Sequence, residues 1–390
     1  MTLIIFLIVL SLLVLVHEAG HFAAARAFGV KVYEFALGFP PRAFGWYKDP
    51  VSGKFRFVWG KGKETMKNTI AGDEPDEQYP STLYAVHWLP LGGFVRIKGE
   101  NGERANEPDS FGAQKAWKRL VILCAGVVMN IIFAALVLSV GFMTGLPTDI
   151  TGMAESELLR VSDKKVLVTQ VQPNSPAQKA GIKMGESIVG VNDVPSKTAD
   201  QAREMIGMDT DGSVALSVRD SAGEVREIIV VPEVLVNSDS IPRVGVVLSD
   251  IGIVQYPFFT SLWKGFVAAI FGLINIFVSL WILIVGLVTG AGASFDVAGP
   301  VGIAGIVGDS ARMGFAYLLN VTAMISLSLA AMNILPIPAL DGGRALFVLV
   351  EMVTRKKVSM RFEQMAHTAG FVLLMILIVV VTWKDIVKLF

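Results

Sequence analysis

The stretch TLIIFLIVLSLLVLVHEAGHFAAA, residues 2–25, contains the pattern that decides the fold. Its apolar run is long enough to cross a bilayer as a helix, which takes about 20 residues. Near its end stand His17 and His21, four positions apart, with Glu18 between them. On a helix both imidazoles project from one face and can bind one metal ion, and the neighbouring carboxylate can take a proton from water. The segment therefore predicts a membrane-spanning helix that carries a metal site.

The position of this motif within an apolar helix strengthens the metal interpretation. A glutamate and two histidines in lipid cost roughly several kcal/mol unless they are paired or bound to a metal. The alternative is a structural role, with the three side chains hydrogen-bonded inside a helix bundle. The single cysteine, Cys124, excludes an intrachain disulfide and the four-cysteine class of zinc site. Any zinc is therefore expected to be held by histidine and carboxylate groups.

The composition is that of a membrane protein. Hydrophobic residues make up 53% of the 390 residues, charged residues make up 17%, and the net charge is zero. Because the chain is neutral and has no basic groove, we expect no nucleic-acid partner. Further apolar runs occupy about 120–144, 262–288, 316–335 and 371–383. The chain is thus predicted to be a polytopic α-helical membrane protein.

Positive charge predicts the orientation in the membrane. No Lys or Arg precedes Arg26, which argues against a signal peptide, and residues 26–119 are rich in both. The positive-inside rule then places the N-terminus outside and residues 26–119 in the cytoplasm. Glycine-flanked alternation at 55–59 and 92–97 predicts short strands or hairpins there. Residues 61–82 form a polar insert, predicted to be flexible, whose purpose is open.

The third metal ligand is expected in NILPIPALDGGR, residues 333–344. A catalytic zinc usually has three protein ligands and an open fourth position. Two prolines end the apolar run, and irregular backbone with an acid at membrane depth is typical of a functional cavity. Asp341 is therefore a better candidate than His87, in the polar loop, or His367, at the start of the last helix. The alternative is that Asp341 is a turn residue just outside the membrane.

Together these motifs resemble the site-2 proteases, and among them the bacterial regulator of sigma-E protease group. The likeness covers nearly the whole chain and rests on four segments: HEAGH at 17–21, PLGGFVR at 90–96, AGPVGI at 298–303, and the segment from Asn333 to Gly343. The resemblance implies zinc ligands at His17, His21 and Asp341. It implies that Glu18 acts as catalytic base and acid, and that residues 90–96 form a membrane-dipping β-hairpin.

Substrate contacts are expected on both sides of this site. A helix resists cleavage because its carbonyls are engaged within the helix, so an edge strand at Gly93, Phe94 and Val95 is expected to hold the substrate extended. The resemblance implies that Asn333 also holds the substrate strand. Two features depart from the family. GVVMN at 126–130 lacks the usual proline, which leaves the role of Asn130 open, and the insert at 61–82 is longer than in the relatives.

The shared zinc sets the predicted topology. Asp341 must approach the same membrane face as the motif at the end of the first helix. If residues 262–288 crossed the bilayer fully, Asp341 would finish on the wrong side. We therefore predict four spans, with 262–288 lying along the outer interface or re-entering the membrane. The alternative, on length alone, is a fifth span.

Three parts are predicted along the chain. An N-terminal membrane region covers 1–150, an extracytoplasmic domain covers 164–236, and a C-terminal membrane region covers 255–390. Residues 174–192 resemble the bacterial PDZ pattern, so one β-rich PDZ domain is expected to be inserted between the membrane regions. Such domains bind peptide segments by strand addition, and the family's implied role is to gate substrate access. The alternative is a spacer with no affinity for peptides.

The predicted function is that of a zinc metalloendopeptidase in the bacterial inner membrane. It would cleave single-span membrane proteins within the lipid bilayer in regulated intramembrane proteolysis. By resemblance, the substrates are an anti-sigma factor already clipped outside, or remnant signal peptides. A non-catalytic receptor that binds partners through the PDZ domain would leave Glu18 unexplained. A zinc transporter would need polar groups across the whole bilayer, whereas this chain has them mainly at one depth.

Overall fold

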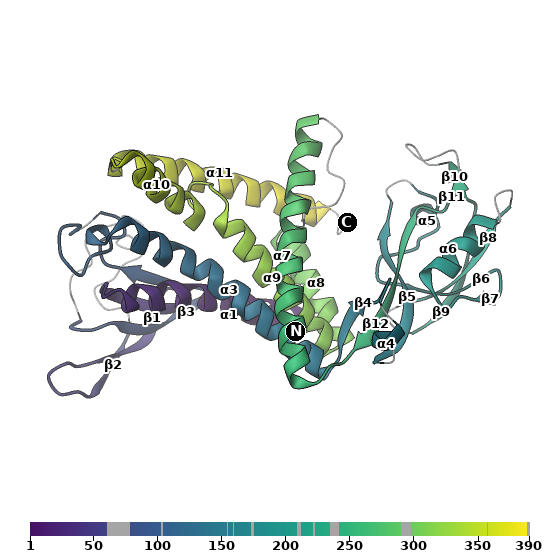
Figure 1. The fold of residues 1–390 in the computed structure, drawn as a ribbon, viewed down its shortest axis with the longest axis horizontal. Helices are drawn as coiled ribbons and strands as arrows, with labels where there is room; N and C mark the ends of the chain where they lie inside the picture. The colour runs from purple at the N-terminus through teal and green to yellow at the C-terminus, as the bar shows by residue number, and fades with distance from the viewer. Residues whose placement is uncertain are drawn as a thin grey trace. The chain divides into compact units, whose positions relative to one another are not determined.

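The computed structural model describes residues 1–60, 79–102, 104–153, 155–158, 160–172, 175–208, 212–220, 223–234, 242–289, 298–356 and 358–387. These residues form two compact units (Figure 1). The first unit combines Met1–Leu138 with Gly265–Phe390, and the second is Ser139–Lys264. Most of the insert predicted at 61–82 lies outside the described residues.

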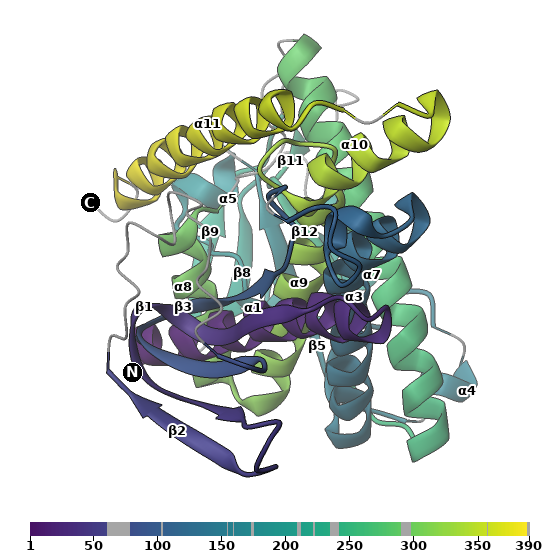
Figure 2. The ribbon, with the colours of Figure 1, turned by 90° about the vertical axis from the view of Figure 1, so that its left-hand side faces the viewer.

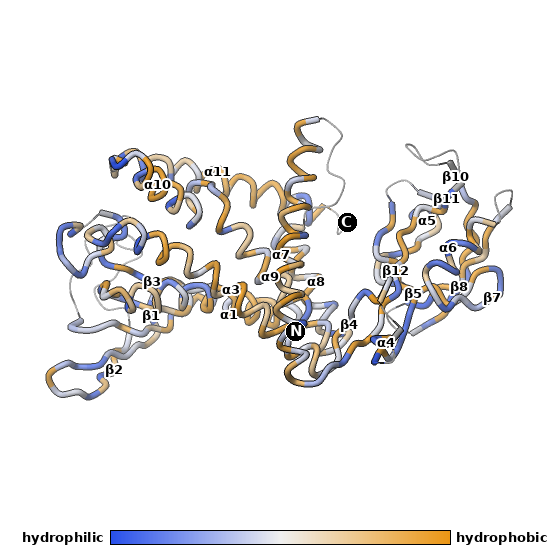
Figure 3. The backbone as a smooth tube through the Cα atoms, viewed as in Figure 1, coloured by the Kyte–Doolittle hydropathy of each residue, from blue (hydrophilic) through white to orange (hydrophobic). Residues whose placement is uncertain are grey.

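Helices dominate the first unit. They are α1 (Thr2–Ala27), α3 (Ala116–Thr144), α7 (Phe258–Thr289), α8 (Pro300–Met313), α9 (Phe315–Ile334), α10 (Asp341–Thr354) and α11 (Met360–Val387). Within the described residues, α1, α3, α7, α9 and α11 are long and apolar enough to cross a membrane. Their hydrophobic residues run along almost their whole length (Figure 3). The chain is thus a multi-pass membrane protein, as its composition predicts.

The five long helices agree with the predicted apolar runs, with one extension, whereas α8 and α10 were not predicted. α11 begins at Met360, whereas the apolar run begins only at about Phe371. Residues 360–370 are more polar, so hydropathy alone does not mark them, but Ser359 caps the helix by accepting a hydrogen bond from the Phe362 amide. The run at 262–288, expected to be interfacial, forms α7, which is as long and as apolar as the other candidate spans.

A β-sheet lies along α1. Its strands are β1 (Val32–Lys48), β2 (Phe55–Trp59) and β3 (Leu83–Ile97), with β1 between β2 and β3. β3 folds back on itself, because Phe35 pairs with both Val95 and Tyr84. β1 also folds back, because Tyr84 pairs with both Phe35 and Trp46. Among the described residues, the arm of β3 at 93–97 pairs only with the first arm of β1, so it forms an edge of the sheet. The strands predicted at 55–59 and 92–97 are confirmed, and Figure 2 shows β3 beside α1.

A small apolar core holds one end of this unit together. It brings together Ala25 of α1, Val32 of β1, Ile122 of α3, and Val348 of α10, all buried. Burying such side chains contributes about 1.5–3 kcal/mol each for the larger ones. Because α1, α3 and α10 meet here, the residues just beyond this core on each helix face one another.

The second unit is a β-rich domain with short helices. Its elements are β4 (Leu146–Asp149), α4 (Glu155–Leu158), β5 (Val161–Val171), α5 (Pro176–Lys179), β6 (Ser187–Val191), β7 (Val194–Pro195), α6 (Ala199–Met208), β8 (Val214–Arg219), β9 (Val225–Val230), β10 (Glu233–Val234), β11 (Pro242–Arg243) and β12 (Val246–Val254). The main sheet has the order β4-β12-β5-β6-β8-β9. Its buried face includes Val168, Leu216 and Leu248, and Ala202 of α6 belongs to the same core.

This unit extends beyond the predicted limits of 164–236 on both sides. The alternating segments at 166–168, 188–191 and 215–218 form parts of β5, β6 and β8. The difference arises from β12, which returns late in the chain and pairs with both β4 and β5. That pairing joins residues far apart in sequence, so local alternation does not reveal it.

Candidate metal centre and active site

Three side chains from opposite ends of the chain converge at one point. His17 Nε2 lies 2.9 Å from Asp341 Oδ2, and His21 Nε2 lies 3.3 Å from the same oxygen. The two histidine Nε2 atoms are 3.1 Å apart. Within the described residues, these three form the only cluster of His, Cys, Asp or Glu able to hold a metal. The structure thus brings together the three residues that the sequence predicted as ligands.

The spacing of the three ligand atoms suits zinc. With bond lengths of about 2.0–2.1 Å and tetrahedral geometry, zinc ligand atoms lie roughly 3.3 Å apart. The observed separations of 2.9–3.3 Å are close to that value. Two imidazoles and one carboxylate also match the ligand types of catalytic zinc sites, and three protein ligands leave a fourth position for water or substrate.

Outer partners orient both imidazoles. His21 Nδ1 donates to the backbone oxygen of Ile122 at 2.8 Å, which leaves the Nε2 lone pair free for a metal. His17 Nδ1 lies 3.4 Å from the side-chain amide of Asn130, which is fully buried. The amide oxygen and nitrogen of asparagine are assigned by their surroundings, and a turned amide can accept the Nδ1 proton. Asn130, whose role the sequence left open, therefore supports His17.

α3 passes directly behind the histidine pair, and two glycines allow it. A Cβ on Gly126 would lie 2.5 Å from His21 Nε2 and 2.8 Å from His17 Nε2. A Cβ on Gly20 would lie 2.3 Å from the backbone oxygen of Ala125. Any side chain at either position would push α1 and α3 apart. The sequence alone does not reveal the role of Gly126, because a glycine in an apolar helix carries no chemical pattern.

Asp341 reaches the histidines through a tight loop after α9. α9 ends at Ile334, and Asp341 opens α10. The intervening Pro336 and Pro338 prevent a continuous helix, as predicted. Ala339 has a φ of 79°, a left-handed conformation that costs an ordinary residue roughly 1–2 kcal/mol.

Two glycines follow Asp341 and let the loop fold back over the start of α10. A Cβ on Gly342 would lie 2.2 Å from the Leu335 oxygen. A Cβ on Gly343 would lie 2.4 Å from the Ile337 oxygen. The residue types of this loop therefore follow from its geometry, since no side chain larger than hydrogen fits at either position.

Glu18 faces a cavity of about 580 Å³ beside the metal site. Phe94, Val95 and Asp341 also line it. The Val95 amide donates to Glu18 Oε2 at 3.0 Å, so this N–H points away from the sheet and toward the site. Gly93 does not line this cavity, although it belongs to the same edge arm.

Asn333 lies in a smaller adjoining space of about 190 Å³. His17, Glu18 and Asp341 also line that space. Asn333 is thus beside the site, where the resemblance to the site-2 proteases places it.

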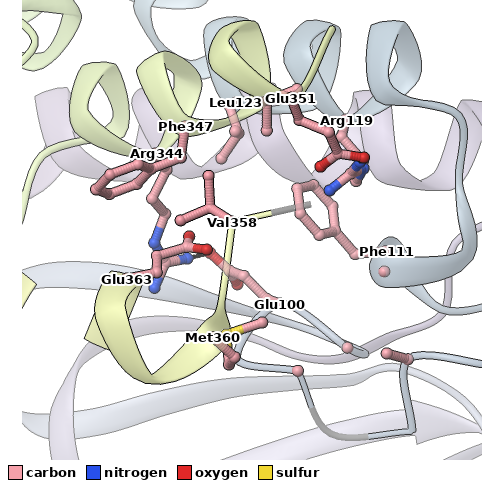
Figure 4. Close-up of a pocket in the computed structure, with 15 residues that line it drawn as sticks. Glu100, Phe111, Arg119, Leu123, Arg344, Phe347, Glu351, Val358, Met360 and Glu363 are labelled. Atoms are coloured by element: carbon pink, nitrogen blue, oxygen red, sulfur yellow. Dashed lines mark hydrogen bonds and ion pairs between the residues drawn. The ribbon is translucent and has the colours of Figure 1, made fainter. Parts of the chain in front are cut away.

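A second cavity, of about 270 Å³, adjoins the first (Figure 4). The two share Glu100 and Arg344, whose side chains form an ion pair. Arg119 and Glu351 form another ion pair at 2.6 Å in the second cavity. The three ligand residues and Glu18 do not line it. It is therefore a charged space next to the active site and not the active site itself.

The two other histidines lie outside the cluster of His17, His21 and Asp341. His87 is buried in the sheet, with Nε2 3.2 Å from Glu34 Oε1. His367 lines the 580 Å³ cavity, but its Nδ1 accepts a hydrogen bond from the Ala339 amide at 2.8 Å. This agrees with the choice of Asp341 over both of them from sequence.

Known proteins are similar to this chain over nearly its whole length. The model of "Peptidase family M50" matches residues 5–60 and 76–377. A protein of Clostridium acetobutylicum, named as a candidate zinc metalloprotease, is 31% identical over 384 residues, which cover 98% of this chain and 97% of the relative. The zinc metalloprotease RasP of Geobacillus kaustophilus is 28% identical over 441 residues, which cover 100% of this chain and 98% of the relative.

The fold and site define a membrane zinc metalloprotease. The chain belongs to peptidase family M50, the site-2 proteases. The resemblance drawn from its motifs is therefore confirmed, as is zinc as its metal.

Proposed function

We propose that this protein cleaves single-span membrane proteins within the bilayer, with His17, His21 and Asp341 as zinc ligands and Glu18 as base and acid. The observation that carries the proposal is the convergence of those three ligand atoms, within 3.3 Å of one another, at the end of the apolar helix α1. Placing a peptidase site on a spanning helix gives it access to substrates in lipid and little access to soluble chains.

The residues around the site have different roles in the proposed reaction. Zinc, when bound, supplies a Lewis acid that activates water and polarises the scissile carbonyl. Glu18 lies in the same cavity as Asp341 and His21 and can take the proton of the attacking water and pass it to the leaving amine. Asn130 and the Ile122 carbonyl hold the two imidazoles in orientation.

The substrate would be held extended along the free edge of β3. In support, the Val95 amide points away from the sheet toward Glu18, and residues 93–97 have no second strand among the described residues. Ser11 donates to the Pro90 oxygen at 2.7 Å, which ties the β3 turn to a point six residues before His17 on α1. At 1.5 Å per residue, that is about 9 Å along the helix, toward its apolar half. We assign Gly93, Phe94, Val95 and Asn333 to substrate binding on this basis.

The topology we propose has four crossings, with α7 along the outer interface. α7 and α11 are the least buried of the long helices, each with 6% of the apolar window inside the protein. The part of α7 in the first unit runs at a large angle to α1 in both Figure 1 and Figure 2. If α1 crosses the bilayer, such a helix lies closer to the membrane plane.

The second unit is proposed to be an extracytoplasmic PDZ domain that binds peptide segments and controls substrate access. A cavity of about 470 Å³ lies between α6 and the start of β12, lined by Arg203, Ile206 and Val246. A groove between a helix and a strand is the place where a peptide adds to a sheet. Arg203 in this groove favours an acidic peptide or the free carboxylate at the end of a chain. A spacer role would leave this groove without a ligand.

By resemblance to its family, the protein would act in a bacterial inner membrane on an anti-sigma factor already clipped outside, or on remnant signal peptides. The test is Glu18→Gln in the full-length protein, assayed on a single-span substrate in vesicles. Loss of cleavage by about 100-fold or more, with zinc content unchanged, supports the proposal, because general acid–base catalysis contributes about 10²–10⁴-fold. Retained cleavage by that variant would refute it.

A further inference from the structure

α11 touches the loop that carries Asp341 at two points. His367 Nδ1 accepts the Ala339 amide hydrogen at 2.8 Å. Gly370 lies three residues further on, on the same face of the helix. A Cβ there would be 2.3 Å from the Pro338 oxygen. Both contacts fall on the two residues that precede Leu340 and Asp341, although most of α11 is exposed.

The hydrogen bond donated by the Ala339 amide stabilises a strained part of the loop. Ala339 has a φ of 79°, which residues with a Cβ rarely adopt. The loop's own hydrogen bonds run from Ile337 to Leu335 and from Leu340 to Ile337, and neither uses the Ala339 amide. His367 is the partner that holds this peptide in its left-handed conformation. If Ala339 relaxed to a negative φ, the following residues would swing and Asp341 would leave the histidine pair.

The tautomer of the His367 ring is consistent with Nδ1 acting as a hydrogen-bond acceptor. Since Nδ1 takes a hydrogen bond from an amide, the ring proton sits on Nε2. Nε2 has no hydrogen-bond partner in the described part of the chain, and the nearest carboxylate oxygen, of Glu363, is 3.9 Å away. His367 therefore makes its polar contact with the loop that carries Asp341 through Nδ1. No other polar contact among the described residues explains its position beside the cavity.

We propose that His367 is a positioning residue for the third zinc ligand. By accepting the Ala339 amide, it holds the strained turn that delivers Asp341 to His17 and His21, and Gly370 provides the space for the loop to lie against α11. The inference rests on the proposed role of Asp341 as a ligand.

The experiment measures the zinc dissociation constant of the purified full-length protein and its variants, without substrate. We expect His367→Ala to weaken zinc binding about 10–100-fold, the loss typical of partners outside the ligand shell. His367→Asn places its amide oxygen near the position of Nδ1 and should restore most of the affinity. Ala339→Gly, added to His367→Ala, should also restore affinity, because glycine adopts positive φ without strain.

Two further variants complete the set. Gly370→Ala should weaken zinc binding like His367→Ala, through the opposite side of the same loop. Met365→Ala, on the exposed face of α11, is the control and should bind zinc like the unmodified protein. If Gly370→Ala fails to fold, the two His367 variants and the Ala339→Gly rescue decide the question.

Unchanged zinc affinity in His367→Ala would overturn the inference. So would equal losses in His367→Ala and His367→Asn with no rescue by Ala339→Gly, because a general loss of packing by α11 would give that result. A protein that binds zinc as expected in all variants but cleaves no membrane substrate would refute the proposed function and leave this inference standing.

Discussion

The backbone amide of Val95 donates a hydrogen bond to Glu18 Oε2 at 3.0 Å, across 77 residues of chain. Through it, the edge strand proposed to hold the substrate is joined to the side chain proposed to carry the proton. A substrate strand that pairs at Val95 would lie within reach of Glu18.

Removing this amide hydrogen should impair cleavage. Val95→Pro deletes the N–H but no bond of the sheet, since this N–H points outward, as proline in an edge strand requires. A hydrogen bond to a charged group contributes about 1.5–3 kcal/mol, so we expect kcat/KM to fall about 10–100-fold on a single-span substrate. Val95→Ala keeps the N–H and is the matched control. Equal activity of the two variants, with zinc retained, would contradict a role for this amide.

Any side chain at Gly126 should destroy the metal centre. Its Cβ would meet His21 Nε2 at 2.5 Å, so Gly126→Ala must displace the imidazoles or α3. Zinc content of the purified variant should fall to the level of a His17→Ala variant. Val128→Ala, on the exposed side of α3, should keep its zinc. Stoichiometric zinc in Gly126→Ala would mean that α1 and α3 do not pack this closely.

Asn130 should tune zinc affinity through His17. Asn130→Ala leaves His17 Nδ1 without its neighbour, and we expect zinc to bind about tenfold more weakly. Asn130→Asp keeps an acceptor oxygen and should bind zinc more tightly than Asn130→Ala. Competition with a chelator of known affinity measures both. Identical affinities in the two variants would show that no hydrogen bond to Nδ1 is involved.

Zinc should stabilise the fold, because its ligands join α1 to α10. A metal that binds only the folded state adds about 2.7 kcal/mol at a free concentration one hundred times its dissociation constant. Addition of a strong chelator should therefore lower the midpoint of thermal unfolding in detergent by several degrees. Asp341→Ala should unfold at the lower temperature with or without chelator. A chelator effect of the same size in that variant would place the stabilising metal elsewhere.

Labelling of single cysteines can test the four-crossing topology. Cys124→Ala removes the native thiol. New cysteines are then placed at exposed positions: Lys197 in the second unit, Val288 at the end of α7, and Ser52 between β1 and β2. With α7 at the outer interface, an impermeant reagent should label 197 and 288 from outside and 52 only after lysis. Protection of 288 from outside labelling would favour a fifth crossing.

Several parts of the site could be predicted because they carry chemistry at a fixed spacing. The two histidines of α1 are four residues apart, and Asp341 stands out as an acid behind two prolines. Their meeting was predicted from the number of ligands that zinc requires.

Other parts follow only from packing between distant segments. Ile122 contributes a backbone oxygen, which every residue has. Gly126 matters because α3 passes behind the imidazoles, and His367 because α11 lies on the loop. The sequence does not place β12 within the second unit, because its pairing partners in β4 and β5 lie 75 to 108 residues before it. Each of these depends on tertiary contacts that a local pattern does not contain.

The proposed ligand set is divided between His17 of α1 and Asp341, 324 positions later. A ribosome makes the chain from its N-terminus, so α1 and the β-sheet are synthesised long before Asp341. During that time the two imidazoles lack their carboxylate partner. If Asp341 is a zinc ligand, the peptidase therefore becomes competent only as translation ends.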